Sequence, residues 1–108
     1  MLTHYPPGMK KGLNRHTDYG FLGLVKSNIP GLEVEDRITK KWVEATPFED
    51  YFVVNIGDML ELWTKGYYKA TPHRVRGNLP SDRLSLGFFL DPGFNTLIGS
   101  NDIPIKQI

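Results

Sequence analysis

The sequence contains no cysteine among its 108 residues. This absence excludes a disulfide framework, a thiolate metal site and a cysteine nucleophile. It is compatible with a reducing compartment, and we expect a cytoplasmic protein. No apolar run approaches the ~20 residues that a membrane-spanning helix needs. Met1 is not followed by a basic segment and a long apolar run, so no signal peptide is expected.

A strong charge of either sign is also missing. The chain has 13 basic and 12 acidic residues and a net charge of +1. It therefore carries no global electrostatic bias toward nucleic acid or an anionic membrane, and we expect neither as a partner.

A strong amphipathic helix is lacking as well, although Thr46–Asp50 could form one helical turn. The length suits one small domain over residues 1–108, with enough apolar residues for a modest core.

Short extended segments, separated by Gly, Pro, Asn and Asp, fill most of the chain. About eight short strands with turns at regular spacing are typical of an all-β sandwich or barrel. The segments that we expect to be extended are Leu2–Tyr5, Phe21–Val25, Leu32–Glu35, Lys41–Ala45, Tyr51–Asn55, Met59–Thr64, Tyr67–Lys69, His73–Arg76 and Arg83–Leu90. The first begins without any lead-in, which is what a fragment of a larger fold would show.

Alternation along a strand predicts which side chains share a face. Over Arg83–Leu90, one face carries Leu84, Leu86, Phe88 and Leu90, a solidly apolar set. Arg83 and Ser85 point the other way. In an extended segment, His16 and Asp18 also share one side.

Three residues could bind a metal ion together, namely His16, Asp18 and His73. Two imidazoles and one carboxylate are the side chains of a facial triad, which holds Fe(II) on one face and leaves the opposite positions open. Each element alone has an ordinary structural explanation. A His and an Asp this close can simply hydrogen-bond near a turn, and His73 beside Arg74 can be a surface histidine. His4 is a weaker candidate ligand, because we expect its neighbour Tyr5 to point inward, which would turn His4 outward.

Arg83 and Ser85 form a candidate receptor for a carboxylate. A guanidinium offers a two-pronged set of donors, and a serine hydroxyl adds a short one. The hydroxyl of Tyr5 could add a third donor to the same carboxylate. The ordinary alternative is an exposed arginine in a surface ion pair.

Four motifs in a fixed order carry a family resemblance. They are His16-Thr17-Asp18-Tyr19-Gly20, the segment from Phe52 to Glu61 (FVVNIGDMLE), the stretch from Tyr68 to Val75 (YKATPHRV) and Arg83-Leu84-Ser85. With Tyr5-Pro6-Pro7 upstream, the chain from about Leu2 to Pro92 resembles the Fe(II)/2-oxoglutarate-dependent dioxygenases. The subgroup that it resembles most is the isopenicillin N synthase-like one.

The resemblance implies a double-stranded β-helix, or jelly roll, with little helix. His16, Asp18 and His73 would be the catalytic iron ligands, and Arg83, Ser85 and Tyr5 would bind the distal carboxylate of 2-oxoglutarate. The implied function is a non-haem oxidoreductase. It couples O2 activation and 2-oxoglutarate decarboxylation to oxidation of a small organic substrate, with ascorbate as a candidate reductant.

The chain departs from the family pattern in three places. Thr3 stands where many members have an asparagine that lines the iron site. The N-terminal region that normally supports the jelly roll has no counterpart, and the C-terminal covering helix is absent or reduced to the tail after Gly93. We therefore expect a fragment whose exposed apolar face binds a second copy or its own missing N-terminal half. Gly23, Gly87 and Trp63 are expected to shape the pocket.

Three alternative functions follow from the same residues. The first is an isopenicillin N synthase-like oxidase, in which the Arg-x-Ser pair grips the carboxylate of the substrate and 2-oxoglutarate is not used. The second is a truncated, non-catalytic jelly-roll module. The third is a cupin-like binding protein, although cupins usually supply more histidine ligands and lack the Arg-x-Ser pair.

Overall fold

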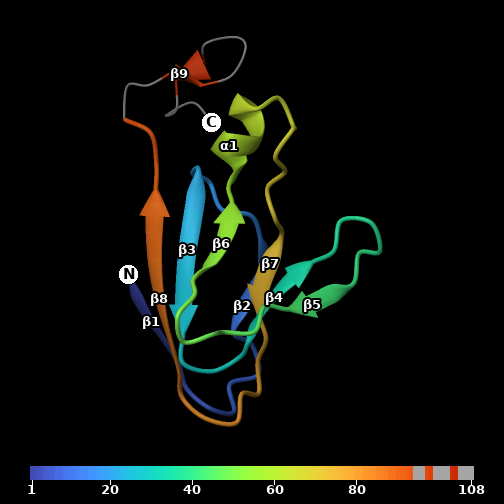
Figure 1. The fold of residues 1–108 in the computed structure, drawn as a ribbon. Helices are drawn as coiled ribbons and strands as arrows, with labels where there is room; N and C mark the ends of the chain where they lie inside the picture. The colour runs from blue at the N-terminus through green and yellow to red at the C-terminus, as the bar shows by residue number, and fades with distance from the viewer. Residues whose placement is uncertain (94–96, 99–102, 105–108) are drawn as a thin grey trace.

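A computed structural model describes residues 1–93, 97–98 and 103–104 of the chain (Figure 1). In these residues the fold is almost entirely β. The strands are β1 (Leu2–Tyr5), β2 (Leu13–His16), β3 (Leu22–Ser27), β4 (Leu32–Glu35), β5 (Trp42–Glu44), β6 (Val53–Ile56), β7 (His73–Val75), β8 (Arg83–Leu90), β9 (Leu97–Ile98) and β10 (Ile103–Pro104), with one helix, α1 (Asp58–Trp63). The described part of the chain contains no helix long and apolar enough to cross a membrane.

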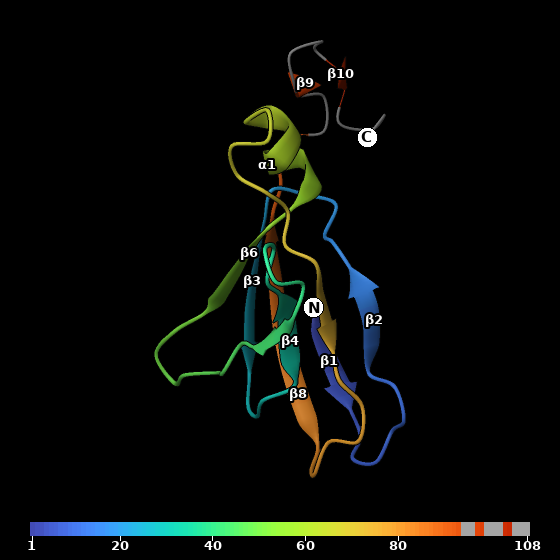
Figure 2. The ribbon, with the colours of Figure 1, turned by 90° about the vertical axis from the view of Figure 1, so that its right-hand side faces the viewer.

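Two four-stranded antiparallel sheets face each other (Figures 1 and 2). The first sheet has the order β1-β8-β3-β6, and the second has the order β2-β7-β4-β5. Helix α1 lies at one end of this sandwich, beside the short β9-β10 pair. The arrangement confirms the all-β jelly roll expected from the sequence. The expectation for the tail after Gly93 concerns residues that lie mostly outside those that the structure describes.

Strand alternation divides the first sheet into an inner and an outer face. Cross-strand pairing sets Tyr5 opposite Arg83 and Thr3 opposite Ser85, and these side chains line the space between the sheets. The neighbouring positions point outward. We call the outward set of apolar residues the outer face: Leu2, Leu22, Leu24, Val54, Leu84, Leu86, Phe88 and Leu90.

Much of the outer face is exposed among the residues that the structure describes. The β8 residues Leu84, Leu86, Phe88 and Leu90 are 45 to 60% exposed, as the sequence predicted, whereas Arg83 on the inner side is 1% exposed. The buried apolar residues are few among those described: Leu32, Met59, Val75 and Leu79. A fully buried arginine and an exposed apolar strand face are both uncommon in folded proteins, so each calls for an explanation.

Two predicted strands are wrong. Met59–Thr64 falls in helix α1 and the residue after it, and Tyr67–Lys69 lies in the bends that follow. The apolar residues of the first segment do not alternate, and tertiary contacts decide in favour of the helix because Met59 is buried against Phe21. Thr46–Asp50 contains no helix, only a turn in which the Phe48 carbonyl accepts a hydrogen bond from the Tyr51 N–H.

Candidate metal and carboxylate site

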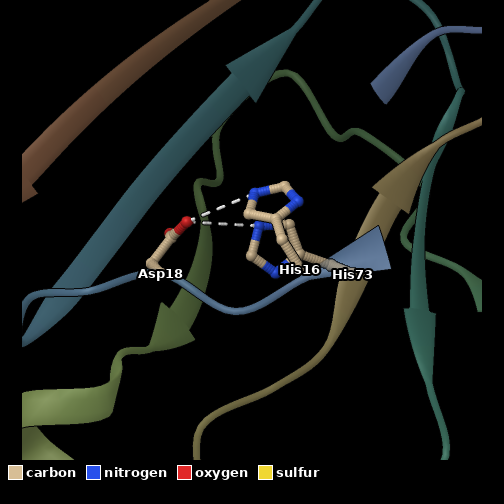
Figure 3. A group of neighbouring side chains, drawn as sticks. All are labelled: His16, Asp18 and His73. Carbon is tan, nitrogen blue, oxygen red and sulfur yellow. Dashed lines mark ion pairs between the residues drawn. The ribbon is translucent and has the colours of Figure 1, made fainter. Parts of the chain in front are cut away.

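His16, Asp18 and His73 come together between the two sheets (Figure 3). His16 ends β2, His73 begins β7, and the two residues are register partners across these antiparallel strands. Asp18 lies two residues beyond β2. Its Oδ1 atom is 3.5 Å from Nε2 of His16 and 3.5 Å from Nε2 of His73. One ligand atom from each residue lies within 4.8 Å of the other two.

Backbone carbonyls fix the orientation of both imidazoles. Nδ1 of His16 hydrogen-bonds the Asn14 carbonyl at 2.8 Å, and Nδ1 of His73 hydrogen-bonds the Thr71 carbonyl at 2.8 Å. Because a carbonyl only accepts, each Nδ1 carries a proton, and in the neutral ring each Nε2 then presents a lone pair to the centre of the group. This is the arrangement in which a metal-binding histidine is held by an outer hydrogen bond.

Asp18 and His73 influence each other's ionisation. The bond from His73 and that from Asn55 outweigh burial, so the pKa of Asp18 is lowered and its carboxylate is ionised near neutral pH. Burial alone would lower the pKa of His73. The bonds to Asp18 and to the Thr71 carbonyl outweigh that effect, and the pKa of His73 is raised above its ordinary 6.5. Perturbed pKa values of this kind cluster at functional sites.

The start of α1 anchors the loop that carries Asp18. The N–H of Asp58 donates to the Asp18 carbonyl at 2.8 Å, and the N–H of Gly57 donates to the Phe21 carbonyl at 2.8 Å. The first N–H groups of a helix have no partner within the helix. In α1 the loop carbonyls accept them, since no side chain caps this end. The loop is therefore fixed by backbone bonds on the side away from the histidines.

The spacing of the three residues fits a small divalent ion. Nitrogen and oxygen ligands lie ~2.0–2.2 Å from such an ion. Neighbouring ligands at right angles would then be about 3 Å apart, so the two 3.5 Å separations need only a small inward movement. Imidazole and carboxylate ligands, with no thiolate, suit a non-haem Fe(II) site. The donor set therefore fits Fe(II).

Arg83 lies in the same cavity without a full set of partners. Among the residues that the structure describes, no atom accepts a hydrogen bond from its Nε or Nη1, although both are buried. The Tyr5 ring lies 5.3 Å from the guanidinium carbon and gives partial compensation. Burial lowers the pKa of Arg83, but an arginine remains charged. A buried, unpaired guanidinium needs an anion, and a carboxylate fits its donors.

One cavity of about 230 Å³ joins the two groups. Its lining contains all six of the residues singled out from the sequence, together with Thr3 and Gly87. The histidines come from the second sheet, whereas Arg83, Ser85 and Tyr5 come from the first. His4 stays outside, where its Nε2 contacts Oδ1 of Asp82 at 2.8 Å. Trp63 does not line the cavity and instead packs against Phe21.

Sequence reasoning assigned no role to Asn55. Its Nδ2 donates to Oδ2 of Asp18 at 2.7 Å, and the residue is 7% exposed. The sequence does contain a feature that points to Asn55. Asparagine is disfavoured in strand interiors, and Asn55 lies between the apolar Val54 and Ile56. A buried polar residue at such a position requires a partner, which the sequence alone did not identify.

Comparison with known proteins identifies the same relationship along most of the chain. The model of the 2OG-Fe(II) oxygenase superfamily matches residues 1–92. Clavatol oxidase claD from Penicillium crustosum is 41% identical over 99% of this chain. The 2-oxoglutarate-dependent dioxygenase citB from Monascus ruber is 40% identical over 83% of it.

A solved structure supports the relationship in three dimensions. The dioxygenase for auxin oxidation from Arabidopsis thaliana, in its complex with 2-oxoglutarate, superimposes with a TM-score of 0.80 and 28% identity, over 93% of this chain and 40% of that one. The present chain spans only 32% of claD and 30% of citB. It thus corresponds to about a third of each of these two relatives.

Proposed function

The chain belongs to the 2OG-Fe(II) oxygenase superfamily, and from this we propose that it forms the iron- and 2-oxoglutarate-binding part of a non-haem oxidoreductase. One observation carries the proposal. A three-ligand group (His16, Asp18 and His73) and a buried, unpaired arginine (Arg83) line the same cavity. Separately, each has an ordinary explanation, but together they match an ion and a dicarboxylate that bind side by side.

The six residues have two tasks in this proposal. His16, Asp18 and His73 hold Fe(II) through two Nε2 atoms and one carboxylate oxygen. Arg83 and Ser85, with Tyr5 beside them, bind the distal carboxylate of 2-oxoglutarate. When bound, Fe(II) and 2-oxoglutarate supply O2 activation, coupled to oxidative decarboxylation of the 2-oxo acid to succinate and to oxidation of a small organic substrate.

The chain itself contributes position and charge. The Asn14 and Thr71 carbonyls hold the two imidazoles through Nδ1, which leaves each Nε2 directed at the place where a metal ion would bind. The Arg83 charge, enclosed between the sheets, favours an anion over water in this half of the cavity. Apolar side chains such as Val25, Leu32 and Phe89 complete the lining and limit solvent.

The alternatives are less well supported. An isopenicillin N synthase-like oxidase would use Arg83 and Ser85 for a substrate carboxylate. The name of citB and the 2-oxoglutarate in the Arabidopsis structure favour 2-oxoglutarate at this position. A cupin-like binding protein would not match the family, and a non-catalytic module would have no need of an unpaired Arg83 facing the ligand group.

The test is turnover of the co-substrate by the purified chain. Protein with Fe(II) should convert 2-oxoglutarate to succinate, slowly without substrate and faster with an accepted one. Ascorbate as reductant stays a prediction, and paired assays with and without it test the point. The proposal would be refuted if a folded, iron-loaded chain neither formed succinate nor bound 2-oxoglutarate.

We further propose that the outer face is an interface. Large exposed apolar patches mark interaction sites or cause self-association. The relatives are about three times as long as this chain, so the remainder of a longer polypeptide is one occupant and a second copy is the other. The isolated chain should self-associate in light scattering, and Phe88→Glu should reduce this. A monomeric wild-type chain with a cooperative melt would count against it.

The cytoplasmic location also stays a prediction, which cell fractionation tests.

A further inference from the structure

The two carboxylate oxygens of Asp18 have different surroundings. Oδ1 faces both histidines, 3.5 Å from each Nε2. Oδ2 points away from them and accepts a 2.7 Å hydrogen bond from Nδ2 of Asn55. Asn55 is almost fully buried, so water does not compete for this bond. One oxygen is therefore free to bind an ion, and the other is held.

The backbone places Asn55 at this position with little freedom. It lies on β6, directly opposite Gly23 on β3. A Cβ atom on Gly23 would lie 2.8 Å from Oδ1 of Asn55 and 3.0 Å from Oδ2 of Asp18. The first distance is shorter than real Cβ contacts, and the second is tighter than most of them, so one of the two side chains would have to move. The missing side chain at Gly23 is what allows the amide and the carboxylate to meet.

We propose that Asn55 is a positioning residue that makes Asp18 a one-oxygen metal ligand, and that Gly23 provides the space for it. The inference rests on the proposed metal site. With Oδ2 held, three protein atoms bind the ion, and three positions of a six-coordinate site stay open. Without the bond from Asn55, the carboxylate could turn and bind through both oxygens. It would then occupy a position that the 2-oxo acid or O2 requires.

The direction of the hydrogen bond follows from the chemistry. An ionised carboxylate only accepts, so the amide must present its NH2 group to Oδ2. Aspartate at position 55 has nearly the same shape and cannot donate when ionised. Alanine removes the donor and leaves space. Aspartate therefore keeps the packing but adds a negative charge beside Asp18, whereas alanine loses the packing and adds no charge, so an effect common to both variants reports the loss of the bond.

The experiment measures binding of Co(II) to the 108-residue chain, by titration and by the visible absorption of the bound ion. Its band intensity and position report coordination number and do not depend on turnover. Asn55→Asp and Asn55→Ala should raise the Kd for Co(II) about 10- to 100-fold, the usual effect of losing such an outer partner. Their spectra should change toward a higher coordination number. Gly23→Ala should act in the same direction with Asn55 still present.

Asn28→Ala is the matched control. The Asn28 side chain also makes two hydrogen bonds, to the Asp82 carbonyl and from the Leu84 N–H, but it does not contact Asp18. Its variant should keep the wild-type spectrum and Kd. Wild-type affinity and an unchanged spectrum in both folded Asn55 variants would overturn the positioning role. Failure of the wild-type chain to bind Co(II) would instead refute the metal site, and the positioning role with it.

Discussion

Replacing Arg83 by methionine should make the ligand-free chain more stable and remove its response to 2-oxoglutarate. Arg83 is 1% exposed, and its Nε and Nη1 have no hydrogen-bond partner among the described residues. Methionine has a similar length, is apolar and needs no partner. The arginine is therefore costly to the empty chain and useful only when an anion is present.

The size of both effects can be estimated. A buried polar group without a partner costs about 1–3 kcal/mol, and a charged one costs more. The Tyr5 ring offsets about 1 kcal/mol of this. We expect Arg83→Met to raise the free energy of unfolding by about 1–2 kcal/mol, within the range seen when buried ions are replaced by apolar residues. For a domain of this size that is a rise in Tm of roughly 5–15 °C.

Arg83→Met should weaken the binding of 2-oxoglutarate, although it stabilises the ligand-free chain. Losing the charged partner of a buried carboxylate costs about 2–5 kcal/mol, which raises Kd at least 30-fold or so. At 100 times the wild-type Kd, 2-oxoglutarate stabilises the wild type by about 2.7 kcal/mol and such a variant by less than about 1 kcal/mol.

Thermal unfolding with Co(II), with and without 2-oxoglutarate, measures both effects without turnover. Arg37→Met is the control, because Arg37 is exposed and lies in the turn between β4 and β5. It should change neither Tm nor the ligand response. A lower Tm for ligand-free Arg83→Met, together with an undiminished response to 2-oxoglutarate, would refute the reasoning.

Four further predictions concern the same site. Asp18→Ala should abolish Fe(II) binding in metal analysis after desalting, whereas Asp82→Ala, which removes an exposed carboxylate outside the cavity, should retain it; equal iron in both would contradict the ligand assignment. The affinity for Co(II), measured by titration, should fall as the pH drops through the pKa of His73, which lies above 6.5, because only the neutral imidazole binds a metal; an affinity that is flat across about pH 6 to 8 would argue against this. In the metal-free chain, Asp18 and His73 should stabilise the fold through their own ion pair. The lowered pKa of Asp18 adds stability that is lost as the pH falls through it, and the raised pKa of His73 adds stability that is lost as the pH rises through it. The pair's contribution to the free energy of unfolding, measured in urea, should therefore be largest at mildly acidic pH. Gly31→Ala should lower the free energy of unfolding by about 1–3 kcal/mol, since Gly31 has φ +154° and an added Cβ would lie 2.9 Å from Cδ of Arg83; an unchanged urea midpoint would show that the backbone and Arg83 adapt freely.

The β architecture could be predicted because alternation is a local property. The boundaries of β1, β4 and β8 agree with the segments expected from the sequence. The grouping of the apolar β8 residues on one face, and of Arg83 and Ser85 on the opposite face, followed from the same period of two. These conclusions needed no knowledge of the second sheet.

The parts that were missed depend on contacts between distant segments. Helix α1 is only six residues long, and its first N–H groups bond to carbonyls of the loop after Asp18 rather than to a side-chain cap. Neither partner is visible in the helix's own sequence. The role of Asn55 likewise depends on Asp18, 37 residues away, and on the lack of a side chain at Gly23. The convergence of His16 with His73 was expected from a family resemblance and not from spacing.

The division of the site between two sheets has a consequence for the length of the acid that fits. The proposed ion ligands His16 and His73 lie on the second sheet, and Arg83 lies on the first, so the gap between the sheets sets the distance from a bound metal to the guanidinium. Packed sheets keep a nearly constant separation of ~10 Å because the side chains between them are incompressible. If the proposed site binds a 2-oxo diacid, this fixed separation should favour the acid whose carbon chain matches the distance from the metal to the guanidinium. Leu32 and Val75 are buried on the second sheet and line the same cavity, so substitutions that change their volume should change the fit of the acid.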